Sequence, residues 1–245
     1  MNVFSNIRVF LVRFYSFFLS NRKSKVIFYH DLHSDIKYTD MSTPLNLFVE
    51  HVNIIRNSGY EIVNKINKEK GQIEISFDDG FLGVYDNINV IRDLNIPIQL
   101  FVVSSYLGRK NHINKDQLLE LSLLSQVTIS SHTHNHYRLD SLQENEVLYD
   151  LEMSKKVIEG LINEKIASIC FPEGIFNLKI INIARKVGFS CLYISIPGFY
   201  SDFFLPGVIK RSLVQFASAN EFKAILRGGD HILYWWYKYK HYIQS

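Results

Sequence analysis

The chain has 245 residues, 47% of them hydrophobic, which is enough apolar material for the core of one large domain. A formal net charge of +3 is too small to indicate a nucleic-acid partner. Two cysteines without CxxC spacing, Cys170 and Cys191, argue against a disulfide framework and against a cysteine metal site, and reduced thiols are typical of the cytoplasm.

Residues 1–24 are predicted to form an amphipathic, basic helix. Apolar residues recur at helical spacing from Val3 and Phe4 to Phe18, and Arg8 and Arg13 interrupt the run. The longest uncharged stretch, residues 14–20, is far shorter than the roughly 20 residues that span a bilayer, and no small-residue cleavage site follows. Two interpretations remain open: the helix packs on the domain, or it lies on a membrane surface near anionic lipid.

Strand-like and helix-like segments then alternate along the chain. In chain order we expect a strand at 25–30, a helix at 43–59, a strand at 73–77, a helix at 81–94, a strand at 98–104, a helix at 115–124, a strand at 126–132, a helix at 141–162, a strand at 165–171, a helix at 177–188, strands at 190–195 and 207–214, and a helix at 219–229. Thr43 is the expected N-cap of the second helix, and Ser141 with Glu144 forms the expected capping box of the longest one.

Seven strands separated mostly by helices predict parallel βα units. No linker rich in Pro, Gly or Ser divides the chain, so we expect a single-domain α/β barrel over residues 25–230. Residues 231–245, which include the sequence YWWYKYKHYIQS, form an aromatic and basic tail. This tail is expected either to cover the core or to make a second interfacial contact.

Ionisable residues gather at the predicted strand ends, where barrels carry their chemistry. His30 follows the first strand, Asp78 and Asp79 follow the second, and the histidine-rich segment 132–136 follows the fourth. Two adjacent carboxylates repel each other unless a cation lies near. If strand geometry persists, Asp78 and Asp79 point in different directions, so one can bind a cation while the other faces a substrate.

The segment HTHNH supplies further metal ligands. His132 and His136 are four residues apart, so a helical turn after the strand would place both on one face and turn His134 away. Asp79, His132 and His136 with one open position would match a catalytic zinc site. Two simpler interpretations remain: the Asp-Asp-Gly sequence is a turn, and the three histidines form a solvated loop.

The segments SFDDG and HTHNH resemble the TFDDG and H-(S/T)-x-x-H motifs of the polysaccharide deacetylases, also called the NodB-homology or carbohydrate esterase family 4 domain. Their separation of about fifty residues is also similar, and the resemblance covers roughly residues 25–215. The two motifs together are specific, although either alone is weak. The resemblance implies a distorted (β/α)7 TIM-like barrel.

The resemblance also implies roles for individual residues. Asp78 would be the general base, and Asp79, His132 and His136 would hold a divalent metal ion, zinc first, with cobalt, nickel or manganese as alternatives. The backbone N–H of Glu173 would help to hold the oxyanion during hydrolysis of an N-acetyl group.

Two departures from the family pattern concern the third and the last motif. Cys170 and Glu173 stand where the family has Arg and Tyr, so the usual brace of the base is absent, and Lys210 or Arg211 is expected to replace it. The late Leu-x-x-His motif is not visible either.

The proton donor to the leaving amine is therefore taken from elsewhere in the chain. The sequence FYHDL is similar to the circularly permuted branch that includes poly-N-acetylglucosamine de-N-acetylases, which makes His30 the expected acid, with His231 as the alternative. His30 could equally be a strand-end histidine that is hydrogen-bonded in the core.

We expect a metal-dependent hydrolase that removes N-acetyl groups from a sugar or polysaccharide precursor in bacterial surface glycan metabolism. The basic aromatic segments at both ends suggest a cytoplasmic protein on the inner face of a membrane, acting on a lipid-linked saccharide. The altered third motif leaves an alternative, which is a non-catalytic saccharide-binding protein on a degenerate deacetylase barrel.

Overall fold

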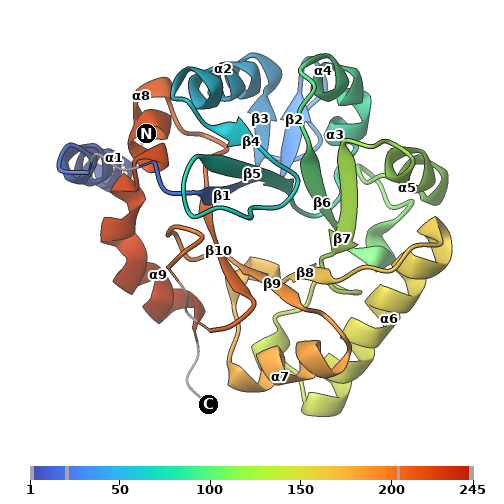
Figure 1. Ribbon diagram of the computed structural model, residues 1–245. Helices are drawn as coiled ribbons and strands as arrows, with labels where there is room; N and C mark the ends of the chain where they lie inside the picture. The colour runs from blue at the N-terminus through green and yellow to red at the C-terminus, as the bar shows by residue number, and fades with distance from the viewer. Residues whose placement is uncertain (1–2, 20–21, 203–204, 243–245) are drawn as a thin grey trace.

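The computed structural model describes residues 3–19, 22–202 and 205–242. Within these ranges the chain forms a closed barrel of seven parallel strands with helices around the outside (Figure 1). In chain order the barrel strands are β1 (Lys25–Tyr29), β5 (Gln72–Phe77), β6 (Ile98–Val102), β7 (Val127–Ser131), β8 (Ser168–Cys170), β9 (Cys191–Ile194) and β10 (Val208–Leu213). Each strand pairs with the next one in that order, and β10 pairs with β1 to close the ring. The predicted single-domain, TIM-like (β/α)7 barrel is thus confirmed.

Three short strands were not predicted. β2 (Asp31–His33) pairs with β3 (Ser42–Pro44) outside the barrel, and β4 (Glu61–Ile62) extends the sheet beside β5. Each has only two or three residues, too few for a period of two to appear in the sequence.

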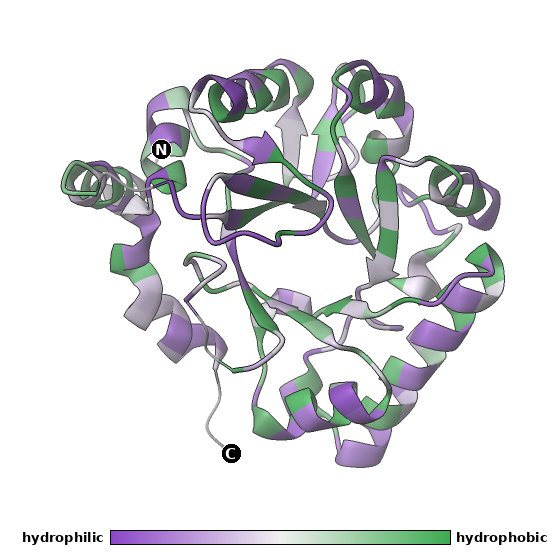
Figure 2. Cartoon of the chain, in the orientation of Figure 1, coloured by the Kyte–Doolittle hydropathy of each residue, from purple (hydrophilic) through white to green (hydrophobic). Residues whose placement is uncertain are grey.

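The outer helices follow the expected positions, with local differences. They are α1 (Val3–Ser16), α2 (Leu45–Asn57), α3 (Leu82–Asp86), α4 (Ile88–Asp93), α5 (Lys115–Ser122), α6 (Glu144–Ile162), α7 (Leu178–Lys186), α8 (Ala219–Leu226) and α9 (Tyr234–His241), and short 3₁₀ turns include η1 (Ser104–Tyr106), η3 (Pro172–Gly174) and η4 (Gly229–Leu233). Hydrophobic and hydrophilic residues alternate along the longer ones, as expected for helices with one face on a barrel (Figure 2).

Three local predictions about these helices were wrong. The helix expected at 81–94 is divided at Asn87, whose side chain donates a hydrogen bond of 2.8 Å to the Gly83 carbonyl. Pro44 rather than Thr43 precedes the first residue of α2, because β3 extends from Ser42 through Pro44 and the helix begins only at Leu45. The capping box of α6 joins Gln143 to Glu146 instead of Ser141 to Glu144.

Apolar side chains lie on both sides of the barrel wall. The larger cluster, between strands and helices, includes Ile27, Ile75 and Phe77. A smaller cluster with Val26 and Phe101 contains the alternate strand positions and therefore lies inside the barrel. Buried polar side chains share that interior, and the site described below lies where they reach the carboxyl ends of the strands.

The first helix packs against α8 and η4 through only part of its surface. Val12 is fully buried, and Arg8 forms a 2.5 Å ion pair with the nearly buried Glu221. Most of the predicted apolar stripe faces solvent instead, and Phe10, Phe14 and Phe17 are 65%, 57% and 84% exposed. The side chains of Val3 and Phe4 lie outside the described part of the chain. Among the helices of the described residues, none has the length and apolarity needed to cross a bilayer.

Candidate active site

A cavity of about 450 Å³ opens at the carboxyl ends of the barrel strands. All the predicted site residues line it, namely His30, Asp78, Asp79, His132, His136 and Glu173. A larger hollow of about 770 Å³ lies beside the end of α1, where Arg22 and Tyr60 line it, but it contains no comparable group of carboxylates and imidazoles among the described residues. The ionisable groups therefore mark the smaller cavity as the site of chemistry.

The carboxylates of Asp78 and Asp79 point apart because the chain turns at Asp79, and not because side chains alternate along a strand. The Asp78 N–H still donates to the Tyr29 carbonyl, at 3.0 Å, and continues the β1–β5 ladder. Asp79 then adopts a left-handed φ of 71°, Gly80 follows with 76°, and the Gly80 N–H donates back to the Asp78 carbonyl. The predicted divergence of the two carboxylates is achieved, although the strand geometry assumed for it ends at Phe77.

Asp79, His132 and His136 converge as predicted. Asp79 Oδ1 lies 3.3 Å from Nε2 of His132 and 3.3 Å from Nε2 of His136. Within the described chain, this buried oxygen has no partner with hydrogen-bond geometry. Ligand atoms at about 2.0–2.1 Å from a tetrahedral zinc ion would lie roughly 3.3 Å apart. The three side chains therefore fit a divalent metal ion and leave coordination positions for water or substrate.

The segment after β7 places both histidines without the helical turn that we expected. Thr133 and His136 have left-handed φ values of 68° and 58°. Asp150 of α6, which is buried, accepts hydrogen bonds from the backbone N–H groups of His134 and Asn135 at 2.8 and 3.1 Å. The His134 ring turns away from the site toward Ser104. The three histidine rings point in the expected directions, but a loop that is anchored by the Asp150 carboxylate positions them, and not a helical turn.

The tautomer of His132 is fixed by the neighbouring strand. Its Nδ1 lies 2.8 Å from the carbonyl oxygen of Cys170, which can only accept a hydrogen bond, so Nδ1 carries a proton. Nε2 then presents its lone pair toward Asp79. Backbone carbonyls commonly orient metal-binding histidines in this way.

Arg211, one of the two residues expected to replace the missing motif arginine, pairs with Asp78. Its two terminal nitrogens donate to Oδ1 and Oδ2 of Asp78 at 2.7 Å each, and both side chains are almost completely buried. The Arg211 guanidinium also lies 4.2 Å from the centre of the Phe28 ring. Burial opposes the charged form of Asp78, but the charge and hydrogen bonds of Arg211 outweigh burial and hold its pKa below the ordinary value. Lys210 points the other way, over Tyr234, so Arg211 is the brace.

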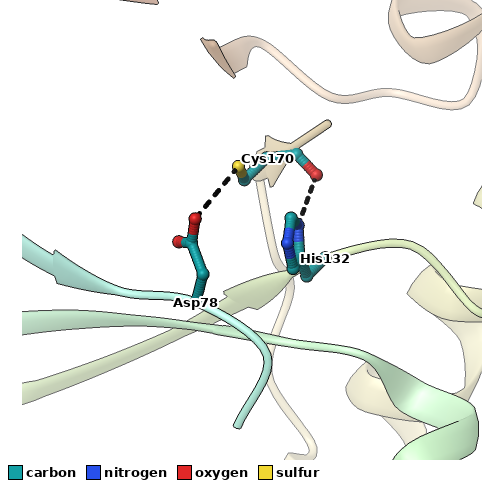
Figure 3. Close-up of side chains that lie close together, drawn as sticks. All are labelled: Asp78, His132 and Cys170. Atoms are coloured by element: carbon teal, nitrogen blue, oxygen red, sulfur yellow. Dashed lines mark hydrogen bonds between the residues drawn. The ribbon is translucent and has the colours of Figure 1, made fainter. Parts of the chain in front are cut away.

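Asp78, His132 and Cys170 form a second compact group (Figure 3). The Cys170 thiol lies 3.8 Å from Asp78 Oδ2, and Arg211 Nη2 lies 2.7 Å from the sulfur. A cation bound there would touch the guanidinium, and burial raises the pKa of the Cys170 thiol, which disfavours the thiolate that a metal requires. The group around Asp79 is therefore the better metal site.

The two candidate acids lie at opposite ends of the barrel. His30 lines the cavity, and its Nδ1 lies 2.6 Å from the side-chain oxygen of Gln215, so Nδ1 carries a proton and Nε2 is the free nitrogen. His231 belongs to η4, next to Asp230, which pairs with Lys25 at the start of β1. Its position excludes His231 from direct contact with the Asp78 cavity and leaves His30.

Glu173 contributes its backbone to the cavity rather than a buried side chain. It has a left-handed φ of 55° and an exposed side chain in the 3₁₀ turn that follows β8. No described residue accepts a hydrogen bond from its N–H. This N–H is consequently available to a ligand.

Four residues at or behind the site were not identified as functional from the sequence. Asp150 holds the loop of His132 and His136, and Gln215 holds His30. Tyr237 and His241 line the cavity from α9. None follows a motif, and each comes from an element whose position depends on the fold.

Comparisons with known proteins agree with this geometry. The family model described as polysaccharide deacetylase matches residues 65–192, which is more than half of the chain. The chain is 24% identical over 187 residues to "Putative polysaccharide deacetylase YxkH" of Bacillus subtilis, covering 72% of this chain and 66% of that protein. It is 25% identical over 158 residues to the poly-beta-1,6-N-acetyl-D-glucosamine N-deacetylase of Staphylococcus aureus, covering 57% of this chain and 54% of that enzyme.

The fold is shared with solved structures at lower identity. IcaB from Ammonifex degensii matches with a TM-score of 0.74 at 19% sequence identity, over 85% of this chain and 98% of that one. The chain spans between about half and two thirds of the length of the two curated relatives. By the family match and by the two motifs that converge in one cavity, the chain belongs to the polysaccharide deacetylase family.

Proposed function

We propose that the chain is a metal-dependent hydrolase that removes N-acetyl groups from a saccharide. One observation carries the proposal: Asp79, His132 and His136 meet around a single point, while the neighbouring Asp78 stays out of that group and is braced by Arg211. Amide hydrolysis at a metal centre needs at least a set of metal ligands and a separate carboxylate base.

A divalent metal ion bound by Asp79, His132 and His136 would polarise the acetyl carbonyl and lower the pKa of water. Asp78, kept ionised by Arg211, accepts a proton from the attacking water. The Glu173 N–H donates to the oxyanion that develops on the carbonyl. His30, oriented by Gln215 through Nδ1 and carrying a second proton on Nε2, delivers that second proton to the leaving amine so that the C–N bond breaks.

The test compares two adjacent substitutions of nearly equal size. Asp78→Asn should keep the metal and lower kcat by roughly 10²–10⁴, because it removes only the proton acceptor. Asp79→Asn should lose both metal and acetate release. Metal content and acetate release are measured with zinc, cobalt, nickel and manganese, on free and lipid-linked N-acetyl sugars. Saccharide binding without turnover, unaffected by Asp78→Asn, would instead identify a non-catalytic binding protein.

We further propose a substrate in bacterial surface glycan metabolism, as the poly-N-acetylglucosamine relative suggests. The exposed face of α1, with Phe10, Phe14 and Phe17, would lie on the inner face of a membrane that presents a lipid-linked saccharide. Arg13 and Arg22 are exposed near this face and complement anionic lipid.

This membrane contact is tested by flotation with vesicles that contain phosphatidylglycerol. The double variant Phe10→Glu/Phe14→Glu should remain with the soluble fraction, whereas the control Leu123→Glu, at a side chain that is 78% exposed just after the end of α5, should float like the wild type. Equal flotation of all three proteins would rule out α1 as the membrane contact.

Zinc is the first choice of metal, and the metal screen decides its identity.

A further inference from the structure

The C-terminal helix reaches the active-site cavity from outside the family-matched segment. Tyr237, Lys240 and His241 of α9 line the same cavity as Glu173 and the candidate metal ligands. No sequence motif indicated that this aromatic, basic segment lies at the site. Its contacts with the Glu173 turn indicate a specific role.

The turn that carries Glu173 has an unusual backbone. Glu173 has φ 55° and ψ 4°, and Gly174 follows with a φ of 68°. A Cβ atom at Gly174 would lie 2.5 Å from Cβ of Ser195, so the turn also packs tightly against the end of β9. Left-handed geometry at a residue with a side chain is unfavourable and persists only where neighbouring structure imposes it.

The end of α9 is part of that neighbouring structure. The Phe176 N–H donates to the His241 carbonyl at 2.9 Å, and the rings of Phe176 and Tyr242 lie 5.2 Å apart. The His241 ring stacks on Tyr237 at 5.5 Å with an interplanar angle of 14°. These contacts fasten the segment 171–176 to the C-terminal helix on one side, while Ser195 holds it on the other.

The His241 side chain is buried without a satisfied polar atom. It is 6% exposed, and neither ring nitrogen has a hydrogen-bond partner in the described chain. Burial and the nearby Lys240 charge lower the pKa of His241, and the backbone of Glu173 opposes that shift. A backbone group raises the pKa of a histidine through its carbonyl oxygen, so the Glu173 carbonyl lies near the His241 ring. A buried polar group without a partner of good geometry costs folding free energy, which an apolar ring of similar shape would avoid.

We infer that His241 is a positioning residue for the oxyanion site: the end of α9 holds the Glu173 turn, and the His241 ring holds the Glu173 carbonyl, which fixes the backbone of Glu173 so that its N–H meets the reacting carbonyl. This inference rests on the proposed de-N-acetylation. It assigns a role in catalysis to the His241 nitrogens, which make no hydrogen bond of ordinary geometry within the described chain.

The experiment compares three variants by steady-state acetate release, thermal unfolding and metal content. His241→Phe keeps the ring stack and removes both nitrogens, so Tm should stay equal or rise. The value of kcat should fall about 10- to 100-fold, which is somewhat less than the roughly 10²–10³-fold decrease that follows loss of an oxyanion donor. KM should change less than about twofold, because the defect concerns the transition state. His241→Gln, which retains an N–H donor, should recover most of kcat.

The control Tyr239→Ala lies on the same helix at a side chain that is 89% exposed, and it should match the wild type in every measurement. A His241→Phe protein with wild-type kcat overturns the inference, and so does one whose kcat falls only in proportion to a lower Tm or a lost metal ion. A wild-type protein that releases no acetate would instead contradict the proposed function itself, so the two failures are distinguishable.

Discussion

Replacing Arg211 by methionine should destabilise the protein strongly, because the substitution leaves Asp78 as a buried charge without its partner. The two groups share two hydrogen bonds of 2.7 Å, and their side chains are 0% and 4% exposed. Breaking such a pair by removing one member typically costs about 3–5 kcal/mol. At roughly 2–4 °C per kcal/mol for a chain of this size, Tm should fall by about 6–20 °C.

The assay is urea unfolding followed by circular dichroism at pH 7.5, on metal-free protein so that metal affinity does not contribute. The double variant Arg211→Met/Asp78→Asn should recover more than half of the lost free energy, because no charge remains buried in it. A double variant that is as unstable as the sum of the two single variants would refute the reasoning and assign the loss to packing of Arg211 against Phe28.

The sign of the pH dependence follows from the direction of the pKa shift. The folded pKa of Asp78 lies below its unfolded value near 3.9, so the ion pair contributes fully above about pH 4. That contribution is lost as the pH falls through the folded pKa. Without Arg211 burial alone raises the pKa, so the Arg211→Met protein should lose stability as the pH rises through the new pKa.

Two further predictions concern residues behind the site. Burial raises the pKa of Glu74 to about 7 from an ordinary value near 4.5. The wild type should therefore lose up to about 3 kcal/mol of unfolding free energy as the pH rises from 4.5 to 7. Glu74→Gln should abolish this loss, as measured by urea titrations at pH 5 and pH 8. Asp150→Ala should weaken metal binding about 10- to 100-fold, as measured by competition with a chelator, because it frees the loop of His132 and His136; wild-type affinity would show that the loop holds its shape without Asp150.

The barrel was accessible from the sequence because its strands are short apolar runs at regular spacing. All seven predicted strands exist, and each of the seven barrel strands lies within its predicted range or within one residue of it. Local features failed where tertiary contacts override propensity. Asn87 divides a predicted helix by binding the Gly83 carbonyl, and Thr43 joins a two-stranded sheet that no periodicity reveals.

The candidate metal ligands could be brought together from the sequence because they lie in two compact motifs at strand ends, and a strand end fixes position closely. The supporting residues were not, because each comes from a distant part of the chain: Asp150 from α6, Gln215 from beyond β10, and His241 from α9. Sequence spacing carries no information on which of many polar residues a folded loop will meet. Arg211 was named only as one of two options, and strand alternation decided between them.

The site also shows how a motif can lose its arginine while a buried positive charge still reaches the neighbouring carboxylate. A carboxylate base needs a buried positive charge at one point in space, and in a closed barrel that point is within reach of several strands. Here β8 supplies Cys170, and β10, two strands away around the ring, supplies the guanidinium to Asp78. The two adjacent aspartates would thus depend on different cations, Asp78 on Arg211 and Asp79 on the proposed metal ion. Removing the metal should therefore leave the Asp78 pair intact, whereas a shared metal would have made both carboxylates fail together.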